Sequence, residues 1–86
     1  MEIRRTIYNP RLLPPDGYTA EYKDLEGDFH KKHFKKGEEE ALRDWMLDIW
    51  KNQENPFFPV FSPIYIYFDI DWDADHILYA KYKRVS

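Results

Sequence analysis

The sequence contains no cysteine, only three glycines and only two serines. The absence of cysteine excludes a disulfide framework and a thiol nucleophile. Three scattered glycines do not provide the glycine-rich loop that holds a phosphate group. Neither Ser62, which lies between Phe61 and Pro63, nor Ser86 occupies the nucleophile-elbow pattern of serine hydrolases. The sequence therefore predicts a protein that is not an enzyme and that uses no cofactor.

Long apolar runs are also missing. No segment approaches the roughly 18 consecutive apolar residues that a membrane-spanning helix requires, and residues 1–5 lack the apolar region of a secretory signal. The net charge of −3 differs from the strongly basic balance that is typical of nucleic-acid binders. We therefore expect a cytoplasmic protein without membrane association, whose partner is a protein rather than a nucleic acid.

Aromatic residues, by contrast, are abundant, because six Phe, seven Tyr and three Trp make up 19% of the 86 residues. A chain of this length is expected to form one compact domain over residues 1–86. A small domain buries a modest fraction of its surface, so its stability depends on a few large side chains. Aromatic residues beyond those in the core are candidates for partner contacts, since Tyr and Trp are enriched in binding hot spots.

The last third of the chain alternates between apolar and polar positions. In residues 64–70 the even-numbered positions are apolar and the odd-numbered positions are tyrosine or aspartate, and residues 77–85 alternate again. A period of two predicts a strand with two unlike faces, and two such runs joined by a short turn predict a hairpin. The expected register gives three cross-strand pairs: Ile66 with Tyr82, Phe68 with Ala80, and Ile70 with Leu78.

Residues 38–53 have the pattern of an amphipathic helix. Apolar residues recur at helical spacing and form one stripe: Leu42, Trp45, Met46, Ile49 and Trp50. Glutamates in the first turn complement the helix dipole, Gly37 is the expected N-cap, and Asn55-Pro56 is expected to end the helix.

Three further strands are expected before the helix, over residues 2–8, 18–25 and 29–34, the last of them the weakest because its middle is polar. A helix buries its stripe against the apolar face of a sheet. The predicted fold class is therefore α+β. It is a small single domain in which an antiparallel sheet of about three to five strands packs on one amphipathic helix, in the order β-β(-β)-α-β-β.

Four aspartates recur at alternate positions from 69 to 75. The pattern resembles a calcium-binding EF-hand loop, but Ala74 stands where glycine is required and Ala80 stands where glutamate closes the loop. His30 and His33 also lack further metal ligands at a recognisable spacing. The sequence therefore predicts no metal site. We interpret the aspartates as a charged hairpin end that opposes aggregation, with a looser cation site and mimicry of nucleic-acid phosphates as alternatives.

The outer face of the hairpin is the predicted binding surface, because tyrosines ringed by aspartates match the anatomy of a protein-binding hot spot. Phenylalanines of the proline-rich segment 55–63 form a second candidate patch. The predicted partner-binding residues are Tyr65, Tyr67, Asp69, Asp71, Asp73, Tyr79, Phe57 and Phe58. We expect a non-catalytic interaction protein, such as a bacterial or phage inhibitor or accessory protein of the anti-defence or immunity type. Its target would be a larger protein with a basic surface, or a second copy of the chain.

The alternative hypothesis is a nucleic-acid-binding module. Residues 30–36 hold four lysines, two histidines and one phenylalanine, a composition that can follow a phosphate backbone with one stacking ring. The tyrosines of the sheet face would extend the stacking surface. The lysines assigned to this function are Lys31, Lys32, Lys35, Lys36, Lys81 and Lys83. No zinc-finger spacing, helix-turn-helix pattern or RNP-type motif accompanies them.

Overall fold

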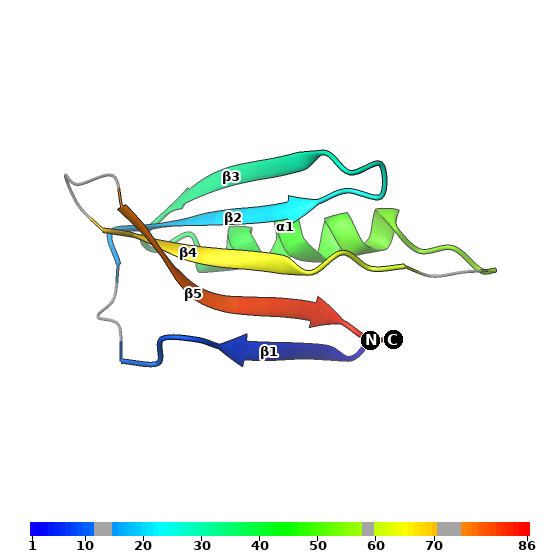
Figure 1. The fold of residues 1–86 in the computed structure, drawn as a ribbon, viewed down its shortest axis with the longest axis horizontal. Coiled ribbons are helices and arrows are strands. Elements are labelled where there is room, and N and C mark those ends of the chain that lie inside the picture. Colours follow the sequence, from blue (N-terminus) through cyan, green and yellow to red (C-terminus); the bar gives the residue numbers. More distant parts are fainter. Residues whose placement is uncertain (12–14, 58–59, 71–74) are drawn as a thin grey trace.

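The computed structural model describes residues 1–11, 15–57, 60–70 and 75–86. It has two layers, with α1 lying behind a five-stranded sheet (Figure 1). The elements are β1 (Ile3–Ile7), β2 (Gly17–Lys23), β3 (Phe29–Lys35), α1 (Glu39–Asn52), β4 (Ile64–Ile70) and β5 (Asp75–Arg84). Neighbouring strands are antiparallel and follow the order β1-β5-β4-β2-β3. The predicted α+β class and the predicted order of elements are confirmed.

The helix forms where its apolar stripe predicts it. Four residues of the stripe are buried: Leu42, Met46, Ile49 and Trp50. Two glutamates in the first turn and a lysine in the last turn complement the helix dipole. The expectation that Gly37 caps the helix is wrong, because Glu38 is the N-cap and Gly37 precedes it with a φ of +91°, which glycine adopts without strain. Among the described residues, no helix is long and apolar enough to span a bilayer.

The core lies between α1 and one face of the sheet. Even-numbered residues of β4 are buried and odd-numbered ones are only partly buried, as the alternation predicts: Ile64, Ile66 and Phe68 against Tyr65, Tyr67 and Asp69. Ala20 of β2 and Ala80 of β5 flank Ile66, and both are fully buried. Their small side chains leave room for the large side chains of α1.

The register of the β4–β5 hairpin differs from the expected one. Ile66 pairs with Ala80 and not with Tyr82. Beyond Ile66 the register shifts through a bulge, so that Tyr67 pairs with Leu78. The other two expected pairs are also wrong, because Phe68 pairs with Ile77 and Ile70 pairs with Asp75. The expected register is displaced by two residues already at Ile66, and the bulge displaces it by one more beyond that point.

Tyr79 is the extra residue of this bulge. A bulge places two residues opposite one and changes the direction of the side chains around it. Tyr79 consequently lies on the helix side of the sheet, where its ring stacks on the ring of buried Phe68 at a centroid distance of 4.1 Å. The expectation that Tyr79 lies on the outer face beside Tyr65 and Tyr67 is therefore wrong.

The proline-rich segment between α1 and β4 is fastened to the end of the helix. The indole Nε1 of Trp50 donates a hydrogen bond to the Ser62 carbonyl oxygen at 2.8 Å. The side-chain amide of Gln53 accepts a hydrogen bond from the Ser62 backbone N–H at 2.8 Å, and its nitrogen lies 3.1 Å from the Ser62 hydroxyl. Between these anchors Phe57 is 92% exposed.

Arg84, at the end of β5, is buried. Its Nη2 lies 2.5 Å from Oε1 of Glu54, and its Nη1 donates to the carbonyl oxygen of Trp50 at 3.4 Å. The guanidinium also lies over the ring of Phe61, 4.1 Å from the centroid. One side chain therefore ties β5 to the end of α1 and to the proline-rich segment.

The first strand pairs with the last one, so the two ends of the chain lie side by side (Figure 1). The backbone N–H of Glu2 donates to the Ser86 hydroxyl oxygen at 3.0 Å. The backbone N–H of Val85 donates to the Glu2 carbonyl oxygen at 2.9 Å. These bonds continue the β1–β5 pairing beyond the strands.

Candidate functional site

One face of the sheet has no covering layer. α1 lies against the opposite face, and no other described segment passes in front of the strands (Figure 1). The open face consists of side chains that alternate with the core residues: Arg4 and Thr6 of β1, Lys81 and Lys83 of β5, Tyr65, Tyr67 and Asp69 of β4, Thr19 and Glu21 of β2, and Lys31, His33 and Lys35 of β3. This surface is available to a partner.

Tyr65 and Tyr67 lie at the centre of the open face, on the middle strand β4. The register places Glu21 and Lys81 on either side of Tyr65. Burial, together with the nearby Glu21 and Tyr65, raises the pKa of the Tyr67 hydroxyl. Residues two apart on a strand are separated by about 7 Å. The two rings therefore form adjacent, partly exposed stacking surfaces.

On the β2–β3 side of the open face the described carboxylates are engaged. Nζ of Lys31 lies 3.5 Å from Oε2 of Glu21. Asp69 accepts a hydrogen bond from the Thr19 hydroxyl at 2.8 Å, and its other oxygen lies 2.7 Å from Nδ1 of His33. These contacts hold both carboxylates in place within the face, where side chains of β2 and β3 occupy them.

On the β5–β1 side the charges are positive. Lys83 lies directly opposite Arg4, and Lys81 lies two residues along on the same face, opposite Thr6. Like charges placed directly opposite each other destabilise a sheet. Arg4 has a loose contact with Glu2 at 3.6 Å between exposed side chains, and neither lysine has an ion pair with a described residue. We call Arg4, Lys81 and Lys83 the cationic strip, which lacks a matching set of anions.

The structure separates the predicted partner-binding residues. Three of them share the open face: Tyr65, Tyr67 and Asp69. Tyr79 lies on the opposite side of the sheet, and Phe57 is exposed on the segment after α1. The remaining three lie outside the described residues: Asp71, Asp73 and Phe58.

The lysine-rich segment of β3 is divided by the alternation of the strand. Lys31 and Lys35 lie on the open face. Lys32 lies on the helix side, where its Nζ is 5.4 Å from the centroid of the Phe34 ring. Lys36 follows the strand. The four lysines therefore do not form one continuous contact surface.

Sequence reasoning missed Arg4 as a site residue. The alternation of residues 2–8 predicts on which face of its strand Arg4 lies. A local pattern does not reveal which other strand pairs with that strand. The juxtaposition with Lys83 depends on the pairing of β1 with β5. The cationic strip therefore becomes visible only when the first and last strands are brought together.

Within the described ranges, no cluster of three or more His, Asp or Glu could hold a metal ion. The chain matches no protein-family model, no curated protein and no solved structure. The geometry and charge of the open face are therefore the basis for a functional proposal.

Proposed function

We propose that the open face binds single-stranded nucleic acid. The observation that carries this proposal is the cationic strip next to two partly exposed tyrosine rings. Cationic side chains contact phosphates and aromatic rings stack on bases, and these two components together account for single-strand binding without sequence preference. A single strand suits the site better than a duplex, because duplex bases are already stacked and their faces are inaccessible.

The net charge of −3 argues against nucleic-acid binding, but the charges are unevenly distributed over the surface. Acidic side chains are concentrated on α1 and on the turn between β2 and β3: Glu39, Glu40, Asp44, Asp48, Asp24, Glu26 and Asp28. The open face, in its described part, holds more lysine and arginine than carboxylate side chains. A chain with a net charge of −3 therefore still presents a cationic surface to a phosphate backbone.

The pairing of Lys83 with Arg4 gives the proposal an energetic reason. Two cations in directly opposite positions repel each other, which costs stability in the free protein. A phosphate bound between the strands would remove that repulsion. The arrangement is therefore better suited to the bound state than to the free state.

The proposal is tested by fluorescence anisotropy with labelled single-stranded DNA and RNA between about 50 and 200 mM salt. Three phosphate contacts predict a slope of about −2 in a plot of log K against log salt concentration. Replacing Lys81→Gln together with Lys83→Gln should reduce the slope to about −0.7. Tyr65→Ala should weaken binding about tenfold.

The control is Lys51→Gln, which removes one lysine charge from an exposed position of α1 and is compared with Lys81→Gln alone. This variant should bind the oligonucleotides as tightly as the unchanged protein does. Absence of binding at the lowest salt concentration contradicts the proposal. A loss of affinity in Lys51→Gln equal to that in Lys81→Gln alone also contradicts it.

A protein partner is the second candidate, and the exposure of Phe57 favours it. A large ring that is 92% exposed between two fastened ends is a suitable anchor for a hot spot. The test places a photo-crosslinking residue at position 57 and, as a control, at exposed Glu26. A defined adduct from position 57 alone, formed in an extract of the source organism, supports this candidate. The same adducts from both positions argue against it.

A further inference from the structure

α1 covers only part of its side of the sheet. A helix is about 10–12 Å wide and strands lie about 4.8 Å apart, so one helix covers between two and three strands. The buried residues of α1 cluster with residues of β2, β3 and β4: Ala20, Phe34, Ile64 and Ile66. β5 and β1 extend past the helix on the same side (Figure 1). These two strands therefore have no helix directly over them, although Ala80 and Arg84 of β5 are buried and Tyr82 is partly buried, so the exposed part of the strip that they form is centred on β1.

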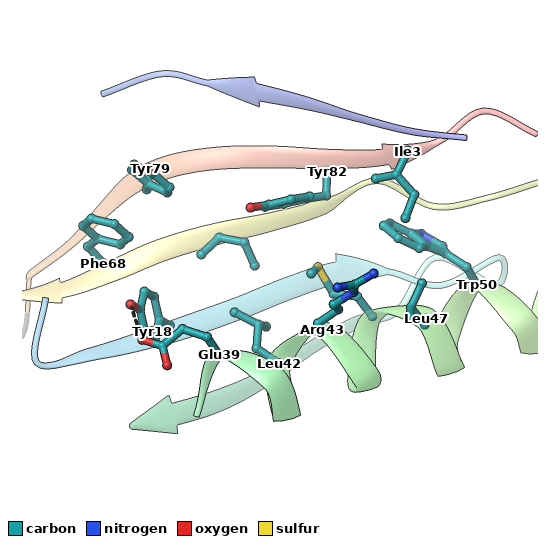
Figure 2. A pocket seen from close by; sticks show the side chains of 12 residues that line it. Ile3, Tyr18, Glu39, Leu42, Arg43, Leu47, Trp50, Phe68, Tyr79 and Tyr82 are labelled. Atoms are coloured by element: carbon teal, nitrogen blue, oxygen red, sulfur yellow. Dashed lines mark hydrogen bonds between the residues drawn. The ribbon is translucent and has the colours of Figure 1, made fainter. Parts of the chain in front are cut away.

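A groove of about 420 Å³ lies between α1 and this strip (Figure 2). Tyr82 of β5 and Ile3 of β1 line it from the sheet, and Leu47 and Trp50 line it from the helix. Trp50 is fully buried, but Ile3 is 40% exposed, and Leu47 and Tyr82 are only partly buried. The groove therefore leaves apolar surface in contact with water, at a cost of about 25 cal/mol for each Å².

Cationic side chains border the groove on both sides. Arg43 lines it from α1. Arg5 of β1 is not a lining residue, but it pairs with the lining residue Tyr82 and lies on the same face of the strand as Ile3, so it is next to the groove on the sheet side. No ion pair joins either arginine to a described residue. The carboxylate in the groove, Glu39, already accepts a hydrogen bond from the Tyr18 hydroxyl at 3.0 Å (Figure 2).

We propose that this groove binds an amphipathic α-helix of another protein, with an apolar stripe flanked by acidic residues. The uncovered strip is as wide as one helix. The eleven residue steps of α1 from Glu39 to Trp50 that border the groove correspond to about 16 Å, or three helical turns. The apolar lining takes the stripe, and Arg5 and Arg43 pair with acids on its two sides. Docking of a helix in a groove is a common mode of recognition.

Among the described residues, a second copy of this chain offers no helix with the required surface. The side of α1 that faces away from the sheet is exposed and charged: Glu40, Asp44, Asp48 and Lys51. It has acids but no apolar stripe to place in the groove. A small apolar ligand, in turn, would use the lining but would not engage the arginines on both sides. The charge pattern therefore favours a helix from a different protein.

The proposal does not depend on nucleic-acid binding, because the groove and the open face lie on opposite sides of the sheet. A labelled oligonucleotide bound to the open face should remain bound when the groove is filled. The two proposals can therefore fail separately.

The test uses two synthetic peptides of about 14 residues, each locked as a helix by a side-chain staple. Both carry leucine at helical spacing on one face. One has glutamate on both flanks of the stripe and the other has lysine. Fluorescence anisotropy with labelled peptides should show saturable binding of the glutamate peptide, at least tenfold tighter than that of the lysine peptide.

A charge-reversed protein, with Arg5→Glu and Arg43→Glu, provides the decisive comparison. Both positions are exposed, so the thermal midpoint of the variant should stay close to that of the unchanged protein. The variant should prefer the lysine peptide. Replacing Arg11→Glu, on an exposed position outside the groove, should leave the preference unchanged.

Three results would overturn the proposal. The first is the absence of saturable binding of either peptide up to millimolar concentration. The second is equal affinity for both peptides that does not respond to the charge reversal. The third is self-association of the unchanged protein in sedimentation experiments, abolished by the charge reversal, because a second copy would then fill the groove.

Discussion

The ring of Tyr79 stacks on the ring of Phe68, with centroids 4.1 Å apart and planes at 16°. The ring of Tyr18 meets Phe68 edge-on, at 5.5 Å and 76°. Phe68 is buried, so the three rings form a compact aromatic group at the end of the groove. The bulge in β5 makes this group, because it directs Tyr79 to the helix side of the sheet.

Tyr79→Ala should therefore reduce the free energy of unfolding by about 2 kcal/mol, through lost burial and a lost aromatic pair. Tyr65→Ala removes the same atoms from the open face and should cost less, about 0.2 to 1 kcal/mol. Urea denaturation followed by circular dichroism measures both. Equal losses in the two variants would mean that the stack on Phe68 contributes nothing beyond ordinary surface contact.

Arg84→Met should reduce the free energy of unfolding by about 2 kcal/mol. The substitution keeps part of the apolar stem but removes the contacts with the Trp50 carbonyl and Glu54, as well as the cation over the ring of Phe61. Glu54→Gln is the informative companion, since its exposed side chain can be solvated and should cost under about 1 kcal/mol. The comparison is made by thermal unfolding. A larger loss in Glu54→Gln would show that the ion pair, rather than the burial of the guanidinium, carries the stabilisation.

Arg4→Thr should have opposite effects on stability and on binding. Removing a cation that lies opposite Lys83 relieves repulsion, so the free energy of unfolding should rise by a few tenths of a kcal/mol, about 0.3. The same change should weaken oligonucleotide binding and make the salt slope less steep by about 0.7. Denaturation and anisotropy on one preparation measure both effects. A lower free energy of unfolding would indicate that the apolar stem of Arg4 contributes more to stability, by packing on its neighbours in the sheet, than the repulsion from Lys83 costs.

Asp24 is expected to make the turn between β2 and β3 sensitive to acid. A short contact with His30, 2.7 Å from Nε2, and hydrogen bonds from the backbone N–H groups of Asp28 and Glu26 lower the pKa of its carboxyl group. A lowered pKa stabilises the fold above the ordinary aspartate value. That stabilisation is lost as the pH falls below about 4 and through the folded-state pKa. Relative to their intrinsic exchange rates, the amides of Gly27 and Asp28 should lose protection over this range.

Asp24→Asn provides the control for this prediction. The asparagine side chain keeps the shape of the aspartate but does not titrate. Backbone amides in the turn should therefore be less protected at neutral pH. Their protection should change little as the pH falls from about 5 through the range in which aspartate titrates. An unchanged acid response in Asp24→Asn would assign the sensitivity to another carboxylate.

Local pattern predicted α1 and β4 most clearly because each of them has a one-sided apolar surface. The stripe of α1 and the parity of β4 have the periods of a helix and a strand, and both periods can be read from neighbouring residues. The bulge at Tyr79 could not be read in this way. A single extra residue leaves the alternation of each half intact while reversing the face of everything beyond it.

The candidate site was only partly predictable, for a related reason. Tyr65 and Tyr67 follow from the parity of one strand, and the structure places them together. The cationic strip combines Arg4 with Lys81 and Lys83, which lie nearly eighty positions later in the sequence. The groove arises because one helix is too narrow to cover five strands. Both depend on strand order, which is set by packing across the whole sheet rather than by any local segment.

The position of β5 between β1 and β4 also constrains how the protein is made. On the ribosome, β1 emerges before the other described strands, but β5, the described strand that pairs with it, is the last of them to be synthesised. The nascent chain must therefore hold an unpaired strand while most of the remaining sequence is translated, and sheet closure is a late event that spans nearly the whole chain. Consecutive arginines at positions 4 and 5 protect β1 until β5 is synthesised, since charge on an unpaired strand hinders its pairing with a neighbouring chain.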